Sequence, residues 1–225
     1  MPQFSNFKSN KYTSITILML IGILALVIAA CVTGWYRVNQ QVGTGRFANY
    51  YFYPTQIKST IVQDGNEVSA IDFDWGSREL TNSHQIINAC VAMAAISWLV
   101  YLATTILAVL VQIEVVQQIG SISAWLLVKI MIIIGTVLLL VSVGILGGFT
   151  PAMRKDINNA NTVTDVFTPC VDTCEFHWAG SNNEVKYGPY TGWIIAIVTF
   201  FFSVAASIFP WFLKDTGFGT PSATA

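Results

Sequence analysis

Charged residues are scarce in this sequence. Lys, Arg, Asp and Glu make up 10% of its 225 residues, whereas a typical soluble domain contains roughly 25%. Hydrophobic residues account for 54% of the chain, and the mean hydropathy is +0.59. A surface with so few charges would not keep a globular protein in solution, so the composition excludes an ordinary soluble domain.

The sequence also lacks the residues that several functional classes need. Its 11 basic and 12 acidic residues give a formal charge of −1, so there is no excess of positive charge to displace counterions from a nucleic acid. It has only two histidines, and no set of nucleophile, general base and orienting group is recognisable. EF-hand spacing, a Gly-rich phosphate loop and a four-ligand zinc pattern are missing. We therefore expect no enzyme activity, no metal or other cofactor, and no nucleic-acid partner.

The apolar residues are concentrated in four long runs. A hydrocarbon core of ~30 Å needs about 20 apolar residues in a helix, and each run reaches this length. Because the backbone of such a run satisfies its own hydrogen bonds in a bilayer only as a helix, the runs predict an all-α transmembrane four-helix bundle. The predicted single domain, residues 1–225, has spans at about 15–35, 86–112, 122–149 and 190–213 and outer loops at 36–85 and 150–189.

The first run has a second interpretation. Lys8 and Lys11 precede it, and Ala29-Ala30-Cys31 near its end resembles a signal-peptide cleavage site or a lipoprotein box. The apolar stretch is longer than the roughly 7–15 residues of a signal-peptide core. We therefore expect it to be retained as a span, whereas cleavage would leave three spans.

Cysteines decide the expected orientation. An even number of spans puts both termini on one side, and Lys and Arg have similar densities on the two sides, so the positive-inside rule does not discriminate. Cys170 and Cys174 lie close together in the second outer loop, where an oxidising compartment would join them in a disulfide. The loops are therefore predicted to be extracellular or lumenal and both termini cytosolic, with the plasma membrane as the expected location.

The first outer loop predicts a small antiparallel β-sheet. Arg46–Tyr53 is rich in aromatic residues, and Gln56–Val62 and Val68–Phe73 are rich in β-branched and aromatic residues. The last two stretches flank Asp64-Gly65-Asn66-Glu67, which is a turn signal. We expect about three strands. A sheet of this size is not stable alone, so it must pack on the helix ends or on the second outer loop.

Two short motifs give this layout a family resemblance. Gly34-Trp35-Tyr36-Arg37-Val38 follows the first span, and Tyr187-Gly188-Pro189-Tyr190-Thr191-Gly192-Trp193 leads into the fourth. With the four spans and the β-rich first loop, they resemble the claudin and peripheral-myelin-protein superfamily. The sequence departs from that family because its first loop has no cysteine and because Ser222-Ala223-Thr224-Ala225 is not a PDZ-binding end.

The resemblance implies a non-enzymatic membrane protein that acts in lateral or cell–cell association, as at a cell junction. Two alternatives are an accessory or structural subunit of a membrane complex and a small channel or transporter. The expected partners are the lipid bilayer and either copies of the chain or other membrane proteins, bound through outer loops and helix faces. The candidate recognition residues of the outer loop are Trp35, Arg37, Tyr50, Tyr51, Phe52, Tyr53 and Trp75.

Tryptophans near the span ends are also expected to act as anchors at headgroup level. Trp35 and Trp193 would lie at the outer face of the membrane, and Trp125 and Trp211 at the inner face.

Lys129 is the single charged residue within the predicted spans. An intramembrane charge is costly and is often functional, so an ion path or a counter-charge for a partner is one interpretation. The structural interpretation is favoured. Lys129 lies about 12 Å of helical rise from the turn near residues 113–121, its stem can reach the headgroups, and Glu114 could pair with it across the hairpin.

Glycines at helical spacing predict close helix packing. Gly144 and Gly148 form a small-xxx-small pair in the third span, Gly135 lies in the same span, and Gly188 and Gly192 repeat the spacing at the start of the fourth. Such pairs allow helices to approach closely, within one chain or between chains.

Overall fold

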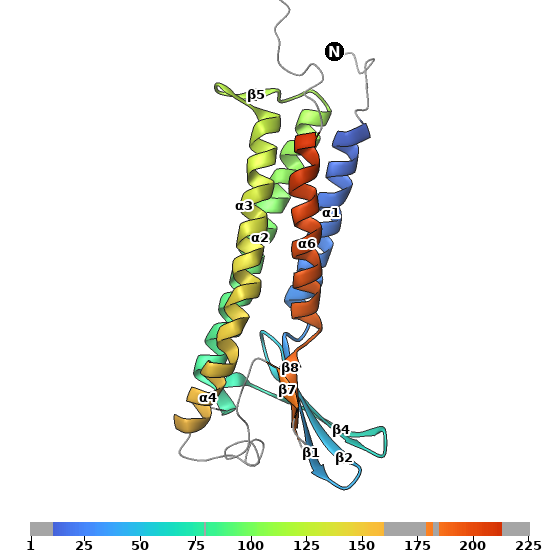
Figure 1. Cartoon of the computed structure of the whole chain (residues 1–225), viewed down its shortest axis with the longest axis vertical. Coiled ribbons are helices and arrows are strands. Elements are labelled where there is room, and N and C mark those ends of the chain that lie inside the picture. The colour runs from blue at the N-terminus through green and yellow to red at the C-terminus, as the bar shows by residue number, and fades with distance from the viewer. Residues whose placement is uncertain (1–10, 79, 160–178, 182–184, 213–225) are drawn as a thin grey trace, which may run out of the picture.

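The computed structural model describes residues 11–78, 80–159, 179–181 and 185–212, and it consists of a bundle of long helices with a β-sheet at one end (Figure 1). The third long helical segment consists of three elements, because α3 continues through the 3-10 turn η2 into α4. Pro151 lacks the N–H that would bond to the carbonyl of Gly147, which accounts for the irregular turn there. The helical elements are α1 (Lys11–Val32), α2 (Thr81–Gln112), α3 (Ala124–Ile145), η2 (Leu146–Gly148), α4 (Phe149–Asn159) and α6 (Thr191–Phe212).

Four helical stretches of the described chain are long and apolar enough to cross a membrane: Thr13–Val32, Thr81–Gln112, Ala124–Asp156 and Thr191–Trp211. Their outward faces carry large apolar side chains, including Leu18, Leu99 and Phe201, which are 68%, 58% and 66% exposed. Lipid tails can cover such a surface, whereas water would not stabilise it. The four predicted spans are confirmed as helices that are long and apolar enough to cross a membrane, which is consistent with a multi-pass membrane protein.

Two of the long helical segments are longer than predicted. α2 begins at Thr81 rather than at residue 86, and the third helical segment continues to Asn159 rather than ending at 149. The apolar runs predict only the part of each helix that a bilayer can bury, and the exposed Arg154 and Lys155 lie on helix beyond that part. The 32 residues of α2 span about 48 Å, against about 33 Å for the 22 residues of α1 or α6. α2 and α4 therefore project roughly 15 Å beyond a hydrocarbon core that α1 and α6 just cross.

A short hairpin joins α2 to α3. It comprises β5 (Gln118–Ile119) and β6 (Ile122–Ser123), with Gly120 at a φ of 64° in the turn between them. This hairpin is the predicted tight turn. It lies at the same end of the bundle as the start of α1 and the end of α6, opposite the sheet (Figure 1).

The sheet is larger than predicted. It has six strands in the order β4-β3-β2-β1-β8-β7, and every described neighbour pair is antiparallel. The first outer loop supplies four strands rather than three, and the second outer loop supplies two more. The second outer loop was one of the two packing partners expected for the sheet. β1 was missed because its polar Asn39-Gln40-Gln41 does not resemble a strand. The strands are β1 (Tyr36–Gly43), β2 (Arg46–Phe52), β3 (Ile57–Gln63), β4 (Asn66–Phe73), β7 (Gly180–Ser181) and β8 (Val185–Pro189).

The two hairpin tips of the first outer loop are linked. Asp64 and Gly65 have φ angles of 50° and 84°, which is the primed turn expected for Asp-Gly between strands. The backbone N–H of Asp64 donates to the carbonyl of Gly45, 3.0 Å away, in the β1–β2 turn. The predicted turn is therefore confirmed, and it holds the neighbouring turn in place.

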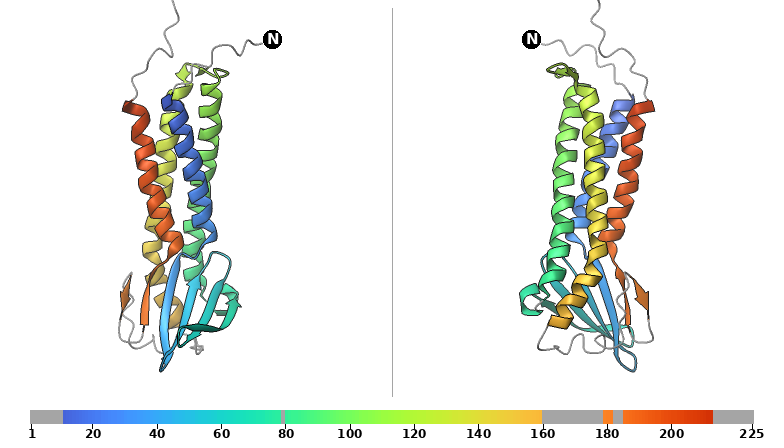
Figure 2. Two further views of the ribbon diagram at one scale, coloured as in Figure 1. Left: turned by 90° about the vertical axis from the view of Figure 1, so that its right-hand side faces the viewer. Right: turned by 60° about the vertical axis from the view of Figure 1, so that its left-hand side comes forward.

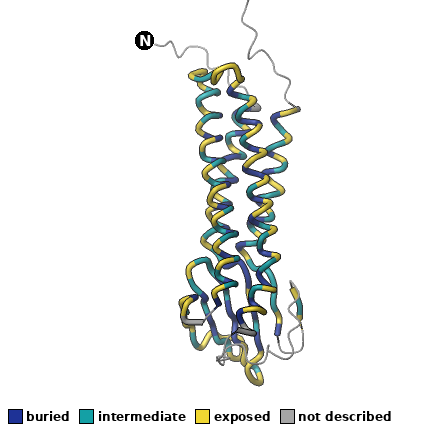
Figure 3. The backbone as a smooth tube through the Cα atoms, turned by 90° about the vertical axis from the view of Figure 1, so that its left-hand side faces the viewer, coloured by how far each residue is buried: buried dark blue, intermediate teal, exposed yellow. Residues whose placement is uncertain are grey.

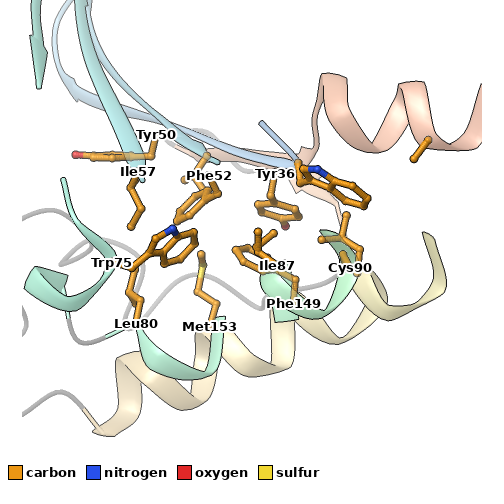
Figure 4. Close-up of a cluster of buried hydrophobic side chains, with 14 of the residues drawn as sticks. Tyr36, Tyr50, Phe52, Ile57, Trp75, Leu80, Ile87, Cys90, Phe149 and Met153 are labelled. Atoms are coloured by element: carbon orange, nitrogen blue, oxygen red, sulfur yellow. The ribbon is translucent and has the colours of Figure 1, made fainter. Parts of the chain in front are cut away.

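One face of the sheet packs against the projecting ends of α2 and α4 (Figures 2 and 4). Tyr36 and Phe52 point from the strands toward Phe149, with ring centroids 4.6 and 5.4 Å away, and Trp75 from the turn η1 (Trp75–Arg78) lies 5.7 Å from Phe52. Burial raises the pKa of the Tyr36 phenol, which therefore stays neutral and hydrogen-bonded to Thr150. This cluster supplies the apolar support that the small sheet needs.

The bundle itself is joined by both apolar and polar contacts. Buried residues follow the inward-facing sides of the helices (Figure 3). Between α2 and α3, Ser97 donates to the Gly135 carbonyl at 2.8 Å, Ser142 donates to the Cys90 carbonyl at 2.7 Å, and the hydroxyls of Tyr101 and Thr136 lie 3.1 Å apart. Such interhelical bonds contribute about 0.6 kcal/mol each on average in a membrane.

Asp156 on α4 caps the first turn of α2. Its buried carboxylate accepts the backbone N–H groups of Asn82 at 3.0 Å and Ser83 at 2.7 Å, and the Ser83 hydroxyl at 2.7 Å. Leu80 occupies the N-cap position and has no side chain that could satisfy these groups. The cap is thus supplied by another helix, and it fixes α4 to the start of α2.

We expect Asp156→Ala to destabilise the protein by about 2–3 kcal/mol, because buried donors of α2 lose a charged acceptor. Asp156→Asn retains one acceptor oxygen and should cost less. Denaturant unfolding of the detergent-solubilised chain measures both, with the exposed Glu67→Gln as the control. Equal stability of Asp156→Ala and the control would contradict the capping role.

Candidate functional site

Trp35 lies at the corner where the sheet joins the membrane helices. Its side chain is fully buried, and its indole N–H donates to the Ala30 carbonyl at 2.9 Å. Its backbone N–H donates to the Phe52 carbonyl, and its own carbonyl accepts the N–H of Tyr190, both at 2.9 Å. The Trp35 side chain is therefore part of the internal packing at this corner and is not on the exposed surface of the described structure.

Three other predicted recognition residues are also core residues. Tyr50, Phe52 and Trp75 are all buried, and Phe52 of β2 and Trp75 of η1 lie between the strands and the helices (Figure 4). Trp75 also donates its indole N–H to the Tyr53 carbonyl at 3.0 Å and stacks on His84. They support the sheet and do not form its exposed surface. Successive residues of a strand point to opposite faces. The sequence does not show which face packs on the helices, so it could not separate these buried residues from their exposed neighbours.

The remaining predicted recognition residues gather on the opposite face, close to the helix ends. Arg37 is exposed, and its guanidinium carbon lies 5.5 Å from the Tyr190 ring centroid. The Tyr51 ring lies 5.0 Å from that of Tyr190. Tyr53 is half-buried next to Gly34. The structure therefore brings Arg37, Tyr51 and Tyr53 together at the membrane-proximal edge of the sheet.

The far end of the sheet exposes apolar side chains that sequence reasoning did not single out. Val42, Phe47 and Val68 are 48%, 37% and 55% exposed and lie near the linked hairpin tips. Each flanks a turn, at a position where an apolar side chain has no helix beneath it to cover it. The sequence feature that could have identified these exposed residues is their position beside the two turns.

The two flanks of the sheet end carry opposite charge. β4 forms an edge of the described sheet and has the exposed acids Glu67 and Asp72. α4 carries the exposed bases Arg154 and Lys155. β4 and α4 lie on opposite sides of the sheet end (Figure 1). An edge strand with unpaired backbone groups is also a place where another chain can bind.

Lys129 is buried at the other end of the bundle. Its ammonium lies 4.9 Å from the ring centroid of Trp211, close to the C-terminal end of α6, where both the ring face and the helix dipole favour a cation. Glu114 is exposed with a φ of 59°, and within the described residues no ion pair joins it to Lys129. The Trp211 contact was not predicted.

The predicted packing glycines differ in how close their neighbours lie. A Cβ on Gly135 would lie 2.8 Å from the Tyr101 ring, and one on Gly192 would lie 3.0 Å from the Gly34 carbonyl, so both allow close approach. Gly148 and Gly188 meet side chains at 3.4 and 3.2 Å. Gly144 has nothing within 4 Å and is exposed.

The expected disulfide falls outside the described residues, as do Cys170 and Cys174 themselves. Cys31 and Cys90, within the described helices, are free thiols. The described ranges contain no group of three or more His, Cys, Asp or Glu residues placed to hold a metal ion.

A comparison with protein-family models finds no match, and a comparison with curated proteins finds no similar sequence. The proposals below therefore depend on the geometry and charge of the chain itself.

Gly135→Ala and Gly144→Ala form a matched pair. The new methyl group at 135 would push against a buried ring, so we expect it to destabilise the bundle by about 1–3 kcal/mol. At 144 the methyl meets open space, and alanine should be neutral or stabilising by up to about 1 kcal/mol. Thermal unfolding in detergent compares them. An equal loss of stability in the two variants would contradict the prediction that position 135 is tightly packed and position 144 is open.

Proposed function

We propose that this protein is a non-enzymatic membrane protein that associates laterally with copies of itself through its sheet end. The observation that carries the proposal is the acidic β4 flank opposite the basic α4 flank. Two copies side by side in one membrane hold these flanks at the same height, so the acidic edge of one faces the basic helix of the next.

Such a contact is head-to-tail. A heterologous interface of this kind leaves a free flank at each end and extends into a row or closes into a ring. The exposed Val68 and Ile71 of β4 add apolar area at the same edge. The arrangement agrees with the role that the claudin-like resemblance implies. In this proposal the sheet lies outside the plasma membrane and both termini lie in the cytosol.

Cell–cell association is a second candidate, favoured by the exposed tips. Val42, Phe47 and Val68 lie at the end of the sheet farthest from the helices, where a protein on an opposing membrane would meet them first. The small-channel alternative has less support in the described bundle, since the buried hydroxyls are engaged within it. Ser97 and Ser142 donate to carbonyls of a neighbouring helix, and Thr136 donates to the Ile132 carbonyl of its own helix.

A charge swap tests the lateral contact. Glu67→Lys and Lys155→Glu each place like charges at the proposed interface, so each should reduce cross-linking between copies in a native membrane about fivefold. The chain carrying both substitutions should recover, because the attraction returns with its sign reversed. Raising the salt concentration should weaken the wild-type contact.

Lys186→Glu serves as the control, because Lys186 is exposed on β8, away from both flanks. Loss of cross-linking in the double variant equal to that of the single variants would count against the proposal.

The accessory-subunit alternative has its own test. If the role of Lys129 is structural and internal to the chain, Lys129→Met should leave co-purification of any partner unchanged, because the stem and its packing on Trp211 are retained. Complete loss of a co-purifying membrane protein would favour a role for the charge in partner binding.

A further inference from the structure

We propose that Arg37 and Lys58, framed by Tyr51 and Tyr190, bind the phosphate of a phospholipid headgroup on the membrane-proximal outer face of the sheet. Strand register brings these residues together. Arg37 of β1 stands opposite Tyr51 of β2, which stands opposite Lys58 of β3. Neighbouring strands are about 4.8 Å apart, so the two basic residues start about 10 Å apart on one face.

The depth of the cluster matches the headgroup layer. Tyr190 immediately precedes α6, whose Ile194 is 53% exposed on the lipid-facing side. Four residues of helical rise place Tyr190 about 6 Å beyond Ile194, and the headgroup layer on each side of a bilayer is roughly 5–7 Å thick. Arg37 contacts the Tyr190 ring and is held at this level.

The donors of the cluster have no carboxylate partner in the described structure. Arg37 lies against the Tyr190 ring, which orients the guanidinium but leaves its N–H groups free to donate. Asp72 stands opposite Lys58 in the register, yet no ion pair joins them among the described residues. An Arg fork matches phosphate oxygens bidentately, and tyrosines are favoured at this depth.

The cluster is also rigid. A Cβ on Gly34 would meet Tyr190 at 3.3 Å and Tyr53 at 3.6 Å, so the tyrosines pack directly on the backbone that joins α1 to β1. The N–H of Gly192 donates to the Gly34 carbonyl at 2.8 Å, which fixes the start of α6 against the same backbone. The basic groups therefore sit on a preformed surface, which lowers the cost of binding.

Native mass spectrometry of the detergent-purified full chain tests the site. Phosphatidylglycerol is titrated onto the wild type, with diacylglycerol as the matched probe that lacks a phosphate. We expect one phosphatidylglycerol to bind in preference to diacylglycerol. Arg37→Gln should weaken its binding about tenfold and Lys58→Gln severalfold, and Arg37→Lys should fall between wild type and Arg37→Gln because it keeps the charge without the fork.

Lys186→Gln is the matched control, since it removes an exposed positive charge from the same face of β8, farther from the helix ends. It should bind as the wild type does. Circular dichroism melting checks that each variant is folded, and Lys58→Gln gives an independent reading if Arg37→Gln is not. Equal binding of the two lipids, wild-type binding by both site variants, or binding of inorganic phosphate as tight as that of the lipid would overturn the proposal.

Discussion

The backbone hydrogen bonds around Gly34 and Trp35 hold the membrane part and the sheet together. Gly34 accepts the N–H of Gly192, and Trp35 pairs with Phe52 and Tyr190. At this one corner the end of α1, three strands and the start of α6 meet. A Cβ at 192 would lie only 3.0 Å from the Gly34 carbonyl, so the close approach of the backbones at this corner is favoured by glycine. The buried indole of Trp35 fills the space beneath it.

The unequal lengths of the helices allow the sheet to be joined to one pair of helices and packed against the other pair. α1 and α6 stop where the strands begin, whereas α2 and α4 continue and present Phe149 and Met153 to the inner face of the sheet. Asp156 keeps these two extensions together at their ends. The sheet is thus joined covalently to one pair of helices and packed against the other pair. Its outer face, its edge β4 and its tips remain available for other molecules.

The sequence predicted the features that local chemistry determines. Four long apolar runs predicted four spans, and Asp64-Gly65 predicted a turn, because bilayer thickness and backbone conformation act on the residues themselves. It did not predict which aromatic residues face outward. Tyr50 and Tyr51 differ in burial only because a register set by several strands turns them to opposite faces. Likewise Gly135 and Gly144 look alike in sequence, and only the position of Tyr101 separates them. Arg154 and Lys155 were predicted to lie in a loop because of their charge, but they lie on α4, which packs against other parts of the fold.

The direction of the strands has a mechanical consequence. β1 continues from α1, and β8 leads into α6, so a pull on the tips away from the membrane acts along the strands (Figure 1). Antiparallel hydrogen bonds lie perpendicular to the strands, so such a force loads many of them in shear at once instead of opening them one by one. The bond from Asp64 to Gly45 shares the force between both hairpins. Tension applied at the tips would therefore pass along the strands into α1 and α6.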